Sequence, residues 1–105
     1  MKRHEDLISH ALPILSRNPY VQKVYLFGSC ARNTENWNSD VDLFVIVDDA
    51  ISNKEIRGLQ TSAVPDDFRL PEVDIVVYRS GSLDETSFFI SQTEQDRRLL
   101  YEKLL

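Results

Sequence analysis

Apolar residues with a helical period open the chain. Between residues 4 and 16 they recur at every fourth position, at Leu7, Ala11 and Leu15, which predicts an amphipathic helix with one buried face. Pro13 lies inside this segment and has no backbone N–H to donate. We therefore expect Pro13 to kink or split the helix.

A second pattern, short apolar runs bounded by turn residues, predicts β-strands. Three such runs are Val21 to Phe27, Val41 to Val47 and Glu72 to Tyr78. The run from Val41 to Val47 is almost entirely apolar, which indicates a strand covered on both faces. Residues 98–102 fit either a short edge strand or a last helical turn.

Two capping boxes predict further helices. In residues 52–55 (Ser-Asn-Lys-Glu) the serine side chain is placed to accept the N–H three residues later, at the start of a helix. The helix that follows would turn Ile56, Leu59 and Ala63 inward. Residues 82–85 (Ser-Leu-Asp-Glu) repeat the pattern and predict a helix that extends to about residue 95.

Candidate chemistry lies around the first two strands. Gly28-Ser29 follows the first strand, and such a turn offers exposed backbone N–H groups to phosphate oxygens. Asp40 and Asp42 stand two positions apart where the second strand begins, so their side chains share a face about 6.6 Å apart. Paired carboxylates bind magnesium together with nucleotide phosphates. The combination predicts phosphoryl or nucleotidyl transfer.

Asp74 adds a third carboxylate at the start of the strand around residues 72–78. Gly28 leaves the first strand where Asp40 enters the second, so the two can share a site if these strands are antiparallel. Asp74 enters its strand as Asp40 does, which predicts a parallel pair joined by a helical crossover. The expected fold is α+β, a mixed sheet of three or four strands with helices packed on it. Clustered carboxylates repel one another unless a cation is bound, and we expect Asp40, Asp42 and Asp74 to form one metal site.

Other polar residues have simpler interpretations. Asp48-Asp49 lies at the far end of the second strand, roughly 20–25 Å from Asp42 at about 3.3 Å per residue, and predicts a solvated loop. His4 and His10 show no ligand spacing, so we expect both at the surface of the first helix.

Composition narrows the class of protein. A chain of 105 residues with 42% hydrophobic residues predicts one domain, residues 1–105. The net charge of −5 disfavours direct binding of nucleic acid, and no apolar run is long enough to span a membrane. The single cysteine permits no internal disulfide and fits a cytoplasmic protein.

The chain also resembles a known family. Residues 26–33 (Leu-Phe-Gly-Ser-Cys-Ala-Arg-Asn) and 38–43 (Asn-Ser-Asp-Val-Asp-Leu) resemble the signature of the DNA polymerase beta-type nucleotidyltransferase superfamily. Residues 73–76 (Val-Asp-Ile-Val) are similar to its third-carboxylate strand. The short chain is most similar to the minimal nucleotidyltransferases, many of which are antitoxins paired with HEPN-type ribonuclease toxins. Residues 98–102 are then expected to form a strand.

The resemblance implies a polymerase beta palm-like fold and a magnesium-dependent nucleotidyltransferase that uses ATP. It implies that Asp40, Asp42 and Asp74 are the catalytic and metal-binding residues, with two Mg²⁺ ions. Gly28 and Ser29 are expected to bind nucleotide phosphates. Arg32 has two open alternatives, a phosphate contact or an ion pair with Glu35.

The acceptor follows from the resemblance as well. We expect AMP to be placed on a hydroxyl, a tyrosine of a HEPN-type toxin, because so short a chain leaves little room for an acceptor-binding domain. Two alternatives stay open. One is a non-catalytic antitoxin that neutralises its partner by covering it. The other is an enzyme that modifies a small cationic molecule with the help of a partner subunit.

Overall fold

The computed structural model describes residues 2–28, 40–64, 73–82 and 97–103. Along the chain these form helix α1 (Lys2–Arg17), strands β1 (Val21–Phe27) and β2 (Val41–Val47), helix α2 (Asn53–Ser62), strand β3 (Val73–Arg79), a 3₁₀ turn (Ser80–Ser82) and strand β4 (Arg98–Glu102). None of the helices in these ranges is long and apolar enough to cross a membrane.

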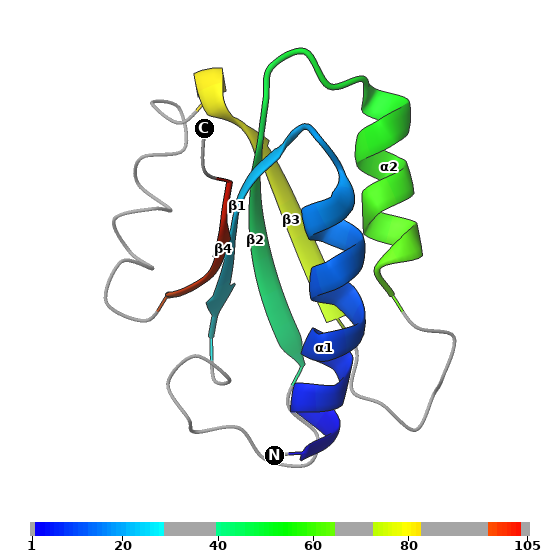
Figure 1. Cartoon of the computed structure of the whole chain (residues 1–105), viewed down its shortest axis with the longest axis vertical. Coiled ribbons are helices and arrows are strands. Elements are labelled where there is room, and N and C mark those ends of the chain that lie inside the picture. Colours follow the sequence, from blue (N-terminus) through cyan, green and yellow to red (C-terminus); the bar gives the residue numbers. More distant parts are fainter. Residues whose placement is uncertain (1, 29–39, 65–72, 83–96, 104–105) are drawn as a thin grey trace.

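The strands form one mixed sheet in the order β3-β2-β1-β4. β1 is antiparallel to both β2 and β4, and β2 is parallel to β3. Both orientations predicted from the motif positions are therefore confirmed, and so is the strand at residues 98–102. β1 ends, and β2, β3 and β4 begin, at the same edge of the sheet, the lower edge in Figure 1. We call this end of the strands the lower edge throughout, as distinct from the outer strands β3 and β4.

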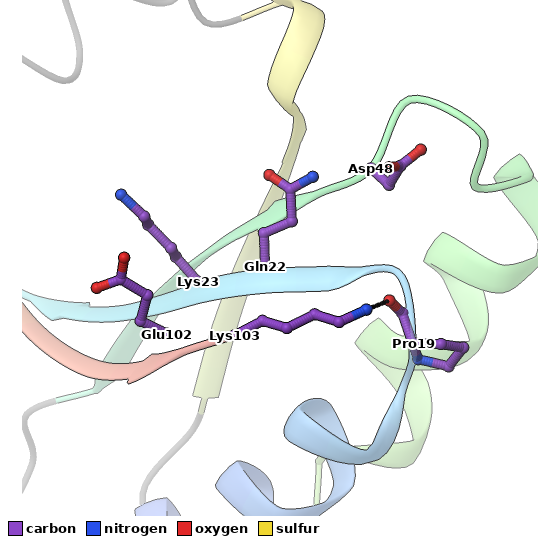
Figure 2. Close-up of a pocket in the computed structure, with 6 residues that line it drawn as sticks. All are labelled: Pro19, Gln22, Lys23, Asp48, Glu102 and Lys103. Atoms are coloured by element: carbon purple, nitrogen blue, oxygen red, sulfur yellow. Dashed lines mark hydrogen bonds between the residues drawn. The ribbon is translucent and has the colours of Figure 1, made fainter. Parts of the chain in front are cut away.

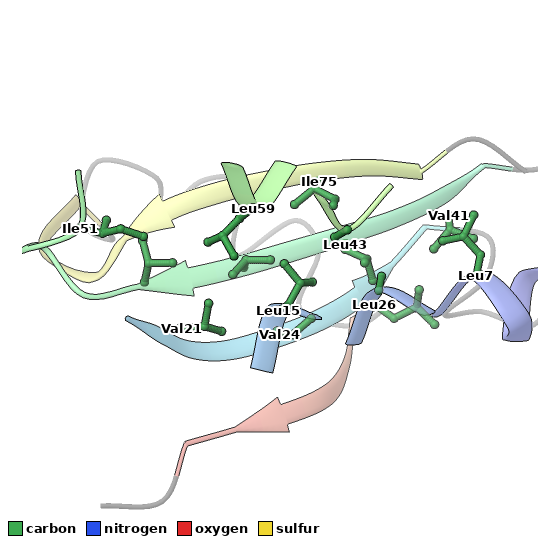
Figure 3. Packing of buried hydrophobic residues seen from close by; sticks show 14 residues of the cluster. Leu7, Leu15, Val21, Val24, Leu26, Val41, Leu43, Ile51, Leu59 and Ile75 are labelled. Atoms are coloured by element: carbon green, nitrogen blue, oxygen red, sulfur yellow. The ribbon is translucent and has the colours of Figure 1, made fainter. Parts of the chain in front are cut away.

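The hydrophobic core lies between one face of the sheet and the two helices (Figures 1 and 3). Alternate strand residues such as Leu26, Leu43 and Ile75 point into it and meet Leu7 of α1 and Leu59 of α2. Because strand side chains alternate between faces, the residues between them point to the other side of the sheet. We call that side the outer face. The core therefore fixes which strand residues point to the outer face.

Helix α1 departs from two predictions. It runs unbroken through Pro13, so the expected split is wrong. The carbonyl that Pro13 leaves without its helical partner belongs to Ser9, and both residues are exposed, so water can satisfy it. His4 is only 2% exposed, which contradicts the predicted surface position, whereas His10 is exposed as expected. The physical reason is that the helix already begins at Lys2, which extends the buried stripe back to residue 4.

Helix α2 begins as its capping box predicts. The hydroxyl oxygen of Ser52 accepts the N–H of Glu55 at 3.1 Å, which satisfies a donor that the first helical turn leaves open. Leu59 and Ala63 are buried and Ile56 packs partly against the core, as expected. The helix predicted for residues 82–95 falls outside the described residues beyond Ser82.

Candidate active site at the lower edge of the sheet

Asp42 and Asp74 stand side by side at the lower edge. They are directly paired across the parallel strands β2 and β3, which puts their Cα atoms about 4.8 Å apart. Val41 and Leu43 flank Asp42 in the chain and are buried in the core, so Asp42 points to the outer face. Asp74 does the same next to Ile75. The two carboxylates that the sequence placed at separate strand starts therefore share one face.

Asp40 completes the group of three acids. It is exposed and lies directly before β2, two residues from Asp42. Burial raises the pKa of the half-buried Asp42 carboxyl above its usual range, and the negative charges of Asp74 and Asp40 raise that pKa further. All three carboxylates are thus close enough to interact electrostatically. A cation among them would remove this repulsion.

At Gly28 the backbone passes close to the carboxylate of Asp42. Its φ of 75° lies in the left-handed region that favours glycine. A Cβ atom built on Gly28 would lie 2.6 Å from Oδ2 of Asp42, closer than real Cβ contacts. The turn after β1 therefore needs glycine for two reasons, its conformation and the space that the Asp42 carboxylate occupies.

These residues fit a magnesium ion through the chemistry of their donors. Mg²⁺ in nucleotide sites takes one or two protein carboxylates and fills its remaining positions with water and substrate phosphates. Asp42 and Asp74, with Asp40 nearby, supply the carboxylate oxygens. Within the described ranges no three His, Cys, Asp or Glu side chains are already arranged around a common metal position.

Two other predicted nucleotide contacts, Ser29 and Arg32, lie outside the described residues. The structure therefore places Gly28 at the lower edge and leaves the roles of Ser29 and Arg32 as predictions.

The sequence interpretation missed a cation that stacks on an aromatic ring of β1. The guanidinium carbon of Arg97 lies 5.1 Å from the centroid of the Tyr25 ring. Tyr25 in turn stacks on Phe44 at 5.9 Å between ring centroids. Arg97 directly precedes the short strand β4, and only the pairing of β4 with β1 brings it to the lower edge. A signal for it existed in the run Arg97-Arg98 before an apolar strand, but the partner strand was not predictable.

Asp48 and Asp49 lie at the opposite end of β2 and have local roles. Oδ1 of Asp48 accepts the N–H of Ala50 at 2.9 Å, and Oδ1 of Asp49 accepts the N–H of Gly81 at 2.7 Å. The interpretation of this acidic pair as an exposed loop is confirmed, because both side chains are solvent-exposed.

A pocket of about 260 Å³ also lies at that far end (Figure 2). The residues that line it are Pro19, Gln22, Lys23, Asp48, Glu102 and Lys103. Nζ of Lys103 donates a hydrogen bond of 2.8 Å to the Pro19 carbonyl, which ties the end of β4 to the turn before β1. None of its lining residues belongs to the carboxylate group, so we do not assign the nucleotide to this pocket.

Comparison with known proteins identifies a family for the chain. The polymerase beta nucleotidyltransferase family matches residues 10–104. A curated relative, the protein adenylyltransferase MntA of Shewanella oneidensis, is 32% identical over 96 residues, which are 83% of this chain and 66% of the relative. The chain thus spans just under two thirds of that relative's length.

Solved structures share the fold. One is a complex of tri-AMPylated Shewanella oneidensis HEPN toxin with MNT antitoxin. It matches with a TM-score of 0.61 and 22% identity over 95% of this chain and 73% of that chain. Another is a spectinomycin adenyltransferase of Enterococcus faecialis with ATP and spectinomycin. It matches with a TM-score of 0.64 and 13% identity over 96% of this chain and 57% of that chain. At these identities the likeness confirms the nucleotidyltransferase fold.

Proposed function

Because the chain belongs to the polymerase beta nucleotidyltransferase family, we propose that it transfers AMP from ATP to a hydroxyl group. The observation that carries this proposal is the pairing of Asp42 with Asp74 on the outer face, next to the glycine turn at Gly28. Burial raises the pKa of Asp42, and the charges of Asp74 and Asp40 raise it further, so an ionised Asp42 is disfavoured there unless a cation is bound. A nucleotide site explains why three acids share the lower edge.

Asp40, Asp42 and Asp74 would hold the magnesium, and our proposal assigns two ions to them. When bound, magnesium neutralises phosphate charge and lowers the pKa of the acceptor hydroxyl. The Gly28 turn lets the phosphates approach the backbone closely, with Ser29 and Arg32 as proposed further contacts. The catalytic effect of these residues is to position the reactants and balance their charge.

The proposed reaction is an in-line displacement. The hydroxyl oxygen of the acceptor attacks the α-phosphorus, and a phosphodiester bond forms while the bond to the β-phosphate breaks. Pyrophosphate leaves with the electrons of that bond. Asp74 accepts the proton of the hydroxyl, because it is the exposed carboxylate on the edge strand β3, where an acceptor can reach it.

The proposed acceptor is a tyrosine of a HEPN-type toxin. The curated relative is named a protein adenylyltransferase, and the neighbouring complex holds an AMPylated HEPN toxin with its antitoxin. A protein acceptor would bring its own binding surface, which suits a small nucleotidyltransferase domain of residues 1–105. A cytoplasmic location is proposed, because the reaction needs ATP and the chain has a single cysteine, which cannot form an internal disulfide.

The test is to incubate the chain with its HEPN partner and measure the intact mass of the partner. With ATP and magnesium the mass is expected to rise by one or more AMP groups, and the toxin should stay inactive after the two proteins are separated. The variant Asp40→Ala with Asp74→Ala should add no mass. The matched control, Asp48→Ala with Asp49→Ala, removes the same charge at the far end of the sheet and should add as much mass as the wild type.

Two outcomes would contradict the proposal. Reversible neutralisation without ATP, retained by Asp40→Ala with Asp74→Ala, would show an antitoxin that acts by covering its partner. Mass gain on a small cationic molecule such as spectinomycin, but not on the toxin, would move the acceptor to the class of the Enterococcus enzyme.

A further inference from the structure

Three strands and the residue that precedes the fourth form a row across the lower edge. Asp74 on β3 is paired with Asp42 on β2, which is paired with Phe27 on β1. On the other side of β1, Leu26 is paired with Arg98 of the antiparallel β4. Arg97 comes one residue before Arg98, as Phe27 comes one residue after Leu26, so continuing this antiparallel register would bring Arg97 next to Phe27. The row therefore runs from two carboxylates on β3 and β2 to Arg97, the residue before β4.

The guanidinium lies on the same face of the sheet as the carboxylates. It sits over the ring of Tyr25, whose chain neighbours Val24 and Leu26 are both buried in the core on the helix side. Tyr25 stacks on Phe44, and Phe44 makes an edge contact with Tyr78 at 5.1 Å between ring centroids. These three aromatic rings lie on the outer face, to which Asp42 also points.

In an in-line transfer, the two ends of the row from Asp74 to Arg97 would contact different groups of the substrates. The entering hydroxyl and the leaving pyrophosphate lie on opposite sides of the α-phosphorus. If Asp74 receives the hydroxyl at the β3 side, the pyrophosphate extends across Asp42 and the Gly28 turn toward β1 and β4. The Tyr25 and Asp42 positions are separated by one strand spacing and two residues, about 8 Å. An arginine side chain over Tyr25 can reach phosphates that start at Asp42.

We propose that Arg97 binds the β- and γ-phosphates of ATP and stabilises the leaving pyrophosphate. This inference rests on the proposed function. A guanidinium matches phosphate oxygens with two parallel N–H donors and stays charged at all relevant pH values. Its contact with Tyr25 holds the cation near the phosphates before the nucleotide arrives, which lowers the ordering cost of binding.

The experiment compares Arg97→Gln with Arg98→Gln in the full chain. Both variants remove one positive charge, but the pairing of Arg98 with buried Leu26 puts it on the helix side of the sheet. Calorimetry with ATP, AMP and pyrophosphate in magnesium buffer measures the three affinities. Arg97→Gln is expected to weaken ATP and pyrophosphate binding about 10- to 100-fold, since a hydrogen bond to a charged group contributes on this scale. AMP affinity should stay unchanged.

Kinetics and a conservative variant separate phosphate binding from a structural role. Arg97→Gln should lower kcat as well as raise KM for ATP, and Arg97→Lys should restore part of both because it keeps the charge. Thermal unfolding verifies that each variant folds. The inference is overturned if Arg97→Gln only lowers the melting temperature and binds ATP like Arg98→Gln, because the contact with Tyr25 would then be purely structural. A wild-type chain that neither binds nor uses ATP would instead overturn the proposed function itself.

Discussion

Replacing Gly28 with alanine should damage both the stability and the chemistry of the site. A non-glycine residue in the left-handed conformation costs about 1–2 kcal/mol, and Gly28 has a φ of 75°. For a domain of this size each kcal/mol lowers the melting temperature by roughly 4 °C or more. The new Cβ atom would lie 2.6 Å from Oδ2 of Asp42, so that carboxylate must move. Because misplacing a reacting group by about 1 Å can cost 10²-fold in rate, we expect AMP transfer to fall about 100-fold.

Gly58→Ala is the matched control for this substitution. Gly58 lies inside helix α2, and a Cβ atom there would meet nothing within 4 Å. The same exchange should therefore stabilise the protein by about 0.5–1 kcal/mol, because glycine disfavours the helix interior, and leave transfer unchanged. Urea unfolding and an incorporation assay with labelled ATP measure both effects. Wild-type stability and transfer in Gly28→Ala would refute the assignment of this turn.

Three further predictions concern Asp42 in the site, the acidic pair at the far end of β2 and the cap of helix α2. Asp42→Asn should abolish transfer yet stabilise the metal-free protein at neutral pH. The raised pKa of Asp42 means that the folded protein takes up a proton more readily than the unfolded chain. The free energy of unfolding of the wild type should therefore fall as the pH rises through that raised pKa. Unfolding in chelator across acidic pH should show a flatter profile for the variant, and an unchanged profile would contradict the burial and repulsion described above. Asp48→Asn with Asp49→Asn should leave magnesium-dependent ATP affinity unchanged in calorimetry; a tenfold loss would show that the far end of β2 takes part in binding. Ser52→Ala should lower the free energy of unfolding by about 1 kcal/mol in urea titration by removing the cap on the Glu55 N–H, and wild-type stability would show that water replaces the cap.

Much of the fold was predictable because its signals are local. β1 and β2 have the bounds that the apolar runs predicted, since each run is closed by turn residues at both ends. The Ser52 cap located the start of α2 for the same reason. The relative directions of the strands followed from a chemical requirement, that Gly28, Asp40 and Asp74 meet at one place. Local pattern and shared chemistry together were enough to orient three strands.

Other features depended on contacts between distant segments. His4 is buried because α1 already begins at Lys2 and packs there against the rest of the protein, which the residue types alone do not reveal. The position of Arg97 depends on how β4 pairs with β1, including a register shift between Val24 and Tyr25. Neither the partner of an edge strand nor an irregularity in its register leaves a pattern in the sequence. The carboxylates were therefore predictable from the sequence, whereas the position of Arg97 over Tyr25 was not.

The order of the strands also implies that the residues of the site differ in local stability, that is, in how easily the strand that carries each of them opens. Gly28 follows β1, and Asp42 lies on β2, and these two central strands are hydrogen-bonded to neighbours on both sides. Asp74 lies on β3 and Arg97 directly before β4, and among the described residues these two outer strands each have one neighbouring strand. Amide hydrogen exchange should consequently be slowest at β1 and β2 and faster at the edges, where local opening requires fewer broken bonds. A phosphate chain bound across the row would join both edges to the rigid centre, and exchange at β3 and β4 should slow when ATP binds.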